Sequence, residues 1–127
     1  GHISPEESLI LCREGRKRGV NMILTHPEFP RTRIGRDDQA ELAKLGVVIE
    51  KNWFNLAQKS VMPEEMAETI RTVGSGHVYL ATDRGQKGAP TPVSELKRFI
   101  AVMLTCGIAE AQIRDMVQKV PEEMVCR

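Results

Sequence analysis

The sequence lacks several features that mark specialised classes of protein. It has only three cysteines, Cys12, Cys106 and Cys126, which lie far apart and form no C-x-x-C pair. A disulfide framework or a structural zinc site is therefore not expected, and a reduced, cytosolic protein is favoured. No apolar run approaches the roughly 20 residues that span a bilayer, and nothing resembles a signal peptide. We therefore expect no association with membranes.

An excess of charge of either sign is also missing. Lys and Arg together number 18 and Asp and Glu 17, so the formal net charge is +1, and the basic residues are spread along the chain. Binding to nucleic acid or to a membrane surface requires a concentrated positive field, so neither partner is expected. The chain opens Gly1-His2 without an initiator methionine. From this we expect either processing or an origin as a piece of a longer protein.

Signals for helices and strands alternate along the 127 residues, which we interpret as a single domain, 1–127. Ser4-Pro5-Glu6-Glu7 predicts a helix start with a capping box and proline in the first turn. Short apolar, β-rich runs predict buried strands. Helices are expected at 5–18, 36–45, 63–73, from 92 onward and at 109–119, and strands at 20–24, 47–50 and 78–82.

Three glycines that end predicted helices, Gly19, Gly46 and Gly74, recur at intervals of 27 and 28 residues. This period is typical of a βαβ series with parallel strands. We predict an α/β fold, specifically a partial (β/α)8 TIM barrel, the C-terminal half, whose first unit lacks its strand. A doubly wound sheet also fits the pattern, but no G-x-G-x-x-G motif or P-loop follows any strand.

The active site of a parallel α/β fold lies at the carboxyl ends of its strands. His26, Glu50 and Asp83 end the three predicted strands, and His2 would end a strand before the first helix. Two imidazoles and a carboxylate suit a divalent metal that activates water. The simpler alternatives are hydrogen-bonded loop histidines, an Asx turn at Asp83 and a Lys or Arg partner for Glu50. His77 precedes its strand and is expected at the opposite rim.

The loop after the third strand carries two glycines and two basic residues ahead of a helix start. Backbone N–H groups and the helix dipole there favour an anion such as phosphate or carboxylate. A glycine-rich turn with solvated basic side chains is the alternative. The candidate anion-binding residues are Arg84, Gly85, Gln86, Lys87 and Gly88.

Three segments together resemble an amidohydrolase-like family of metal-dependent hydrolases with a (β/α)8 barrel. They are Gly1-His2 before the Pro-Glu-Glu helix, Thr25-His26-Pro27 and Thr82-Asp83-Arg84-Gly85-Gln86. The resemblance covers essentially the whole chain as the C-terminal half of the barrel. It implies that His2, His26 and Asp83 bind the metal and that Asp83 also accepts a proton from the attacking water. The family's His-x-His pair on the first strand has no counterpart here.

The expected function is therefore hydrolysis of an amide, ester or phosphoester in a small, anionic substrate, with zinc or manganese as the metal. The isolated chain is expected to have an incomplete site. The alternative is a non-catalytic α/β module that binds an anion or self-associates. A homo-oligomer, or a missing N-terminal half, is expected to cover the open edge of the sheet.

Overall fold

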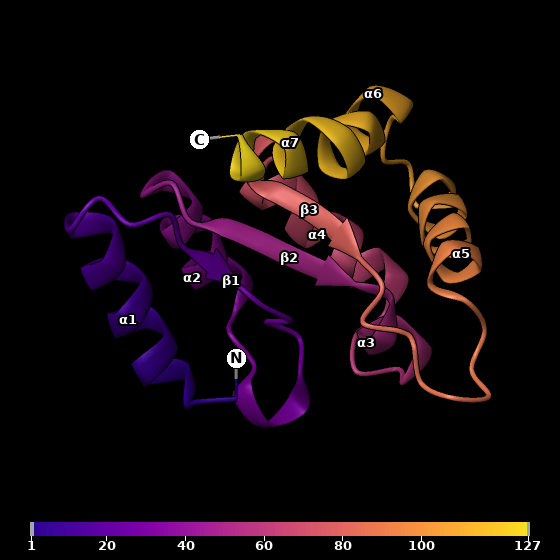
Figure 1. The fold of residues 1–127 in the computed structure, drawn as a ribbon, viewed down its shortest axis with the longest axis horizontal. Helices are drawn as coiled ribbons and strands as arrows, with labels where there is room; N and C mark the ends of the chain where they lie inside the picture. Colours follow the sequence, from indigo (N-terminus) through magenta and orange to yellow (C-terminus); the bar gives the residue numbers. More distant parts are fainter. Residues whose placement is uncertain (1, 127) are drawn as a thin grey trace.

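The computed structural model describes residues 2–126 as a three-stranded sheet surrounded by helices (Figure 1). The strands are β1 (Ile23–Leu24), β2 (Val48–Asn52) and β3 (Val78–Ala81). The helices are α1 (Pro5–Lys17), α2 (Arg36–Lys44), α3 (Trp53–Ala57), α4 (Pro63–Val73), α5 (Pro92–Thr105), α6 (Glu110–Arg114) and α7 (Val120–Val125). Short 3-10 turns occur at Pro30–Thr32 and Ser75–His77, and a π-helical turn spans Asp115–Lys119.

The strands are parallel and lie in the order β1-β2-β3, as the helix–glycine–strand period predicts. Gly19, Gly46 and Gly74 all adopt positive φ, of 75°, 83° and 90°, which a side chain would oppose. The predicted parallel sheet and its strand order are thus confirmed, and the fold is mixed α/β. The sheet has three strands in the described residues and does not close into a barrel.

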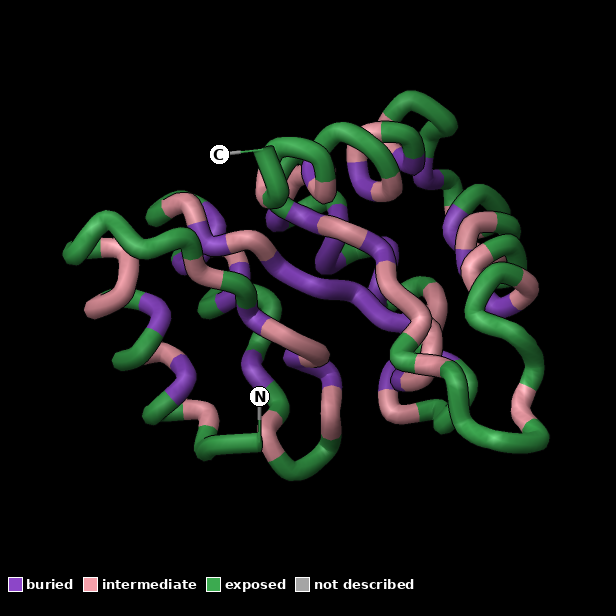
Figure 2. Tube along the Cα trace, in the orientation of Figure 1, coloured by how far each residue is buried: buried purple, intermediate pink, exposed green. Residues whose placement is uncertain are grey.

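The two faces of the sheet differ in character. Register and alternation place five residues on one face, all of them buried: Leu24, Ile49, Lys51, Val78 and Leu80. Helices α1, α2 and α4 contact one another in sequence, and α1 and α2 also contact strands β1 and β2. The chain trace shows the buried residues running along β2 and the inward sides of these helices (Figure 2). The core therefore lies between the sheet and this helical layer.

The opposite face of the sheet is only partly covered. Ile23 is 42% exposed, and Val48, Tyr79 and Ala81 are partly buried. Where the strands begin, the C-terminal helix α7 lies across this face and borders a cavity of about 470 Å³ that is also lined by Ile23, Val48 and His77. A polar group, described below, occupies the same face where the strands end.

The structure differs from the predicted boundaries at two places. Strand β2 continues through Lys51 to Asn52 and leads directly into α3, which the sequence analysis did not predict. The last helix, expected to stop near Lys119, continues to Val125. Pro121 is tolerated because it follows a widened π turn, in which the Val120 N–H bonds to the Asp115 carbonyl five residues earlier.

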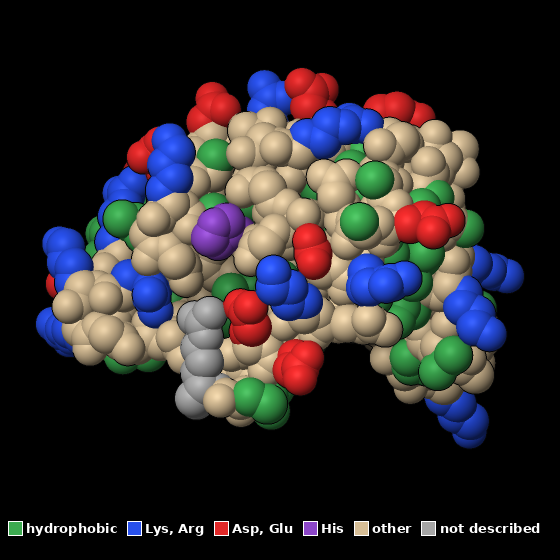
Figure 3. Space-filling model, turned by 90° about the horizontal axis from the view of Figure 1, so that it is seen from above, with side chains coloured by type: hydrophobic (Ala, Val, Ile, Leu, Met, Phe, Trp, Pro, Cys, Tyr) green, Lys and Arg blue, Asp and Glu red, His purple; other side chains and the backbone are tan. Residues whose placement is uncertain are grey.

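Charges of both signs are interspersed on the molecular surface, as Figure 3 shows for one face. None of the helices in the described part of the chain has both the length and the apolar character needed to span a bilayer. The cysteines are free: Cys12 is buried in α1, Cys106 is half-buried at the end of α5, and Cys126 is exposed.

Candidate functional site

The carboxyl ends of the three strands gather at one rim of the sheet, because the strands are parallel and adjacent. His26 lies two residues after β1, Glu50 lies within β2, and Asp83 lies two residues after β3. His77 immediately precedes β3 and is therefore at the opposite rim. The structure thus places His26 and Asp83 at one rim and His77 at the other, as the sequence predicts, whereas Glu50 lies two residues before the end of β2 and not at its end.

His2 and His26 lie side by side at this rim. Their ring centroids are 5.1 Å apart with the planes tilted by 52°, and Phe29 contacts both rings with centroid distances of 5.8 Å. His26 is partly buried, and its Nδ1 is buried without a hydrogen-bond partner among the described residues. The structure therefore brings together two of the three predicted metal ligands.

The backbone at His26 is in the left-handed region, with φ of 36°. A non-glycine residue in this region is strained. The conformation is held by a tight turn, in which the Phe29 N–H donates to the His26 carbonyl at 3.0 Å. Pro27 is the second residue of this turn, a position that the fixed φ of proline favours. The turn brings the Phe29 ring back against the His26 imidazole, so that Phe29, His26 and His2 form one cluster of rings.

Asp83 also has a positive φ, 51°, and its side chain is exposed. Its carbonyl accepts a 3.4 Å hydrogen bond from Gln86 Nε2. Because β2 lies between β1 and β3, two strand spacings of about 4.8 Å separate the strands that carry His26 and Asp83. No group of three or more metal-binding side chains forms within residues 2–126. Asp83 shares the rim with the histidines but does not join them in one cluster.

Glu50 is buried, 6% exposed, on the less covered face of the sheet. Its Oε2 accepts a 2.8 Å hydrogen bond from the Tyr79 hydroxyl, and its Oε1 accepts a 3.1 Å bond from Asn52 Nδ2. Burial, together with the hydrogen bond to Glu50 and the negative charge of Glu50, raises the pKa of Tyr79. The sequence suggested a lysine or arginine partner for Glu50, whereas its observed partners are a hydroxyl and an amide.

The loop after β3 is anchored through Arg84. Its guanidinium lies over the Phe54 ring, 5.4 Å from the centroid, and its Nε is 3.3 Å from Glu95 Oε2. Glu95 is only 2% exposed and also accepts hydrogen bonds from Trp53 Nε1 and Arg98. Arg84 is thus electrostatically balanced by a buried carboxylate.

The remaining residues of the predicted anion site, Gly85, Gln86, Lys87 and Gly88, are exposed. The helix that follows them, α5, is capped by its own Thr91, whose hydroxyl oxygen accepts from the Ser94 N–H at 3.3 Å. Lys87 is therefore the exposed cation of this loop, and anion binding there stays a prediction.

A buried polar cluster on the helix-covered face was missed by the sequence analysis. Lys51 is fully buried, and its Nζ donates to Glu28 Oε1 and to Gln39 Oε1. Burial lowers the pKa of Lys51, while the charge of Glu28 opposes this shift. The partners of Lys51 lie 23 and 12 residues away in the sequence. Around Lys51 itself the sequence shows only a charged residue at the end of an apolar strand, which does not predict the buried cluster.

Comparison with known proteins finds a family match at the start of the chain. Residues 1–50 match a protein family described as a family of unknown function, DUF6282. The matched segment contains His2 and His26 and ends before Asp83. Neither the curated proteins nor the solved structures contain a match to this chain.

Proposed function

We propose that the chain binds a divalent metal through His2 and His26, as part of the site of a metal-dependent hydrolase. The observation that carries the proposal is the pairing of the two imidazoles, with Nδ1 of His26 buried and unpartnered. A tetrahedral metal about 2.0–2.1 Å from each ring nitrogen holds two imidazole centres roughly 5 Å apart. The separation of 5.1 Å between His2 and His26 fits this requirement.

In this proposal the sheet represents consecutive strands of an amidohydrolase-like (β/α)8 barrel. The parallel order β1-β2-β3 and the helical layer on one face support it. The opposite face carries Glu50 and Tyr79 and would line the barrel interior. The resemblance of the three strand-end segments to that family is the basis for naming the reaction class.

The chain's own residues have distinct roles in the proposed site. His2 and His26 provide neutral nitrogen ligands, and the turn at Pro27 orients the second imidazole. Asp83, exposed on the same rim, is assigned as the proton acceptor. A bound zinc or manganese ion supplies Lewis-acid polarisation and lowers the pKa of a coordinated water. The substrate class is a small, anionic amide, ester or phosphoester.

Metal binding can be tested by calorimetric titration of zinc and manganese into the wild type, His26→Ala and His77→Ala. His77 is the matched control because it lies at the opposite rim. We expect weak binding by the wild type, since two protein ligands form an incomplete coordination shell. His26→Ala should abolish it and His77→Ala should retain it. Equal affinity in all three proteins would reject the site.

The catalytic part of the proposal needs a separate measurement. Hydrolysis of p-nitrophenyl acetate and p-nitrophenyl phosphate should be followed with added metal for the wild type and Asp83→Asn. Little turnover is expected from the chain alone, and any that occurs should require both the metal and Asp83. Metal-dependent turnover that is unchanged in Asp83→Asn would reject Asp83 as the proton acceptor.

A further inference from the structure

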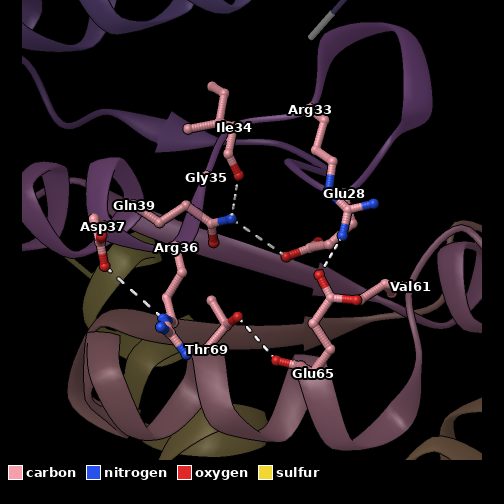
Figure 4. Close-up of a pocket in the computed structure, with 10 residues that line it drawn as sticks. All are labelled: Glu28, Arg33, Ile34, Gly35, Arg36, Asp37, Gln39, Val61, Glu65 and Thr69. Atoms are coloured by element: carbon pink, nitrogen blue, oxygen red, sulfur yellow. Dashed lines mark hydrogen bonds and ion pairs between the residues drawn. The ribbon is translucent and has the colours of Figure 1, made fainter.

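Each face of the sheet borders a cavity, and the two cavities differ in the charges of their walls. The cavity on the helix-covered side, of about 290 Å³, lies between the loop after β1, the start of α2 and helix α4 (Figure 4). The guanidinium groups of its wall are paired with carboxylates, Arg33 with Glu65 and Arg36 with Asp37 and Glu68. The charges of this wall therefore offset one another.

The larger cavity, of about 470 Å³, lies on the less covered face of the sheet where the strands begin, at the opposite rim from the proposed metal site. Its volume falls in the range of about 300–1,000 Å³ that is typical of small-molecule sites. Strands β1 and β2 form one wall and helix α7 another. The apolar part of the lining consists of Met22, Ile23, Val48, Val120, Met124 and Val125.

Arg16 brings a fixed positive charge to this cavity. Its Nε donates a 2.9 Å hydrogen bond to the Leu45 carbonyl. Its Nη1 donates to the Val20 carbonyl at 2.9 Å and to Asn21 Oδ1 at 3.3 Å. All three acceptors are neutral, so these bonds orient the guanidinium without offsetting its charge.

The third guanidinium nitrogen of Arg16, Nη2, packs over Gly46, which also lines the cavity. A Cβ at Gly46 would lie 2.9 Å from Nη2, so the absence of a side chain there makes room for the guanidinium. Glu123 lines the same cavity but is exposed, so water screens its charge more than that of the partly buried Arg16. The cavity therefore favours a ligand that places a negative charge beside Nη2.

We propose that this cavity binds an amphiphilic carboxylate, such as a medium-chain fatty acid. The carboxylate accepts hydrogen bonds from Arg16, and the hydrocarbon tail lies between the sheet and α7. The tail covers Val48 and Ile23, which is 42% exposed without it, and contacts Met124 on the helix. Burial of apolar surface provides the affinity, and the guanidinium selects the charge of the head group.

The probes are hexanoate, octanoate and decanoate, each titrated while backbone amide chemical shifts are recorded. Saturable shifts are expected at Ile23, Val48 and Met124, and each two added methylenes should tighten binding by about tenfold until the cavity is filled. Octylammonium and 1-octanol, which lack the carboxylate, should bind about tenfold more weakly than octanoate. Equal binding by octylammonium, or no saturable shift with any of the three carboxylates, would overturn the proposal.

Two substitutions of Met124 provide a matched pair of variants. Met124 is partly buried on α7 and lines the cavity, so a charged side chain there lies beside the bound ligand. Met124→Glu should weaken octanoate binding by about tenfold, whereas Met124→Lys should retain or tighten it. Both variants change the packing of α7, so the difference between them reports charge. Equal affinity of the two variants for octanoate would overturn the site.

The role of Arg16 is tested by Arg16→Met, with Arg13→Met as its control. Arg13 is an exposed residue of the same helix that does not line this cavity. Arg16→Met should weaken octanoate binding by about tenfold or more, whereas Arg13→Met should leave it unchanged. Octanoate affinity equal to that of the wild type in Arg16→Met would overturn the assignment of the carboxylate. The Met124 pair decides the question if Arg16→Met does not fold.

Discussion

Lys51 Nζ donates a hydrogen bond to Glu28 Oε1 in the interior, where neither side chain is more than 5% exposed. Replacing Lys51 by Met would leave the Glu28 carboxylate buried without its cation. We expect Lys51→Met to lower the free energy of unfolding by about 3–5 kcal/mol. Urea denaturation followed by circular dichroism measures this loss.

Two further variants separate lost charge pairing from other effects of substitution. Lys44→Met removes an ion pair with Glu41 whose side chains are 72% and 61% exposed, and it should change stability little. The double variant Glu28→Leu with Lys51→Met removes both buried charges and should recover much of the loss. A Lys51→Met protein as stable as Lys44→Met would show that the buried pair contributes nothing.

The Tyr79–Glu50 hydrogen bond predicts a specific dependence of stability on pH. Tyr79→Phe leaves Glu50 Oε2 buried without a donor, which should cost about 1–3 kcal/mol at neutral pH. The raised pKa of Tyr79 means that the folded protein holds the hydroxyl proton of Tyr79 more tightly than the unfolded chain does. Its contribution is fully present below the unfolded pKa of about 10 and decreases as pH rises toward the folded pKa.

The measurement is the difference in unfolding free energy between wild type and Tyr79→Phe, recorded from neutral pH to above about pH 10. Other groups that titrate in this range are common to both proteins and largely cancel in the difference. The difference should be constant below this pH and shrink above it. A difference that grows with pH would contradict the assigned direction of the shift.

Most of the α/β architecture was predictable because its signals are local. Pro5, Pro63 and Pro92 stand at helix starts, and Gly19 and Gly46 follow helix ends with positive φ. These residues restrict the backbone whatever surrounds them. The apolar runs between them could then only be buried strands, and the right-handed crossover rule fixed the strand order.

The features that were missed depend on contacts between distant residues. The charge of Lys51 predicts that the strand ends before this residue. Strand β2 nevertheless continues through Lys51, because Glu28 and Gln39 bond to its ammonium group in the interior. Trp53 begins α3 because Asn52 caps the helix, accepting from the Asn55 N–H at 3.0 Å. At the site, the rim positions of His26 and Asp83 followed from strand order, but the His2–His26 pairing depends on the path of the first residues.

The open edge of β1 predicts self-association. No strand pairs with the outer side of β1 in the described residues, and Val20 and Ile23 are 50% and 42% exposed beside it. An uncovered, apolar edge favours pairing with another chain.

Sedimentation at micromolar concentration should show a dimer or larger species, and Ile23→Lys should shift the protein to monomer. Val93→Lys, at a 66% exposed position on α5, is the matched control. A wild type that is monomeric throughout this range would contradict the prediction.

Glu95 joins three parts of the fold, and its removal should release the loop after β3. Its buried carboxylate accepts from Trp53 Nε1 in α3 and pairs with Arg84 in the loop and with Arg98 on its own helix. Glu95→Ala would leave the partly buried Arg84 without its counter-ion, so we expect a loss of about 3 kcal/mol in unfolding free energy. Trp53 is the single tryptophan, so its emission spectrum should change when the carboxylate bonded to its indole N–H is removed. Arg98→Ala, which removes a 65% exposed partner of the same carboxylate, should leave both stability and emission nearly unchanged. Identical emission spectra for Glu95→Ala and Arg98→Ala would show that Glu95 does not fix the indole.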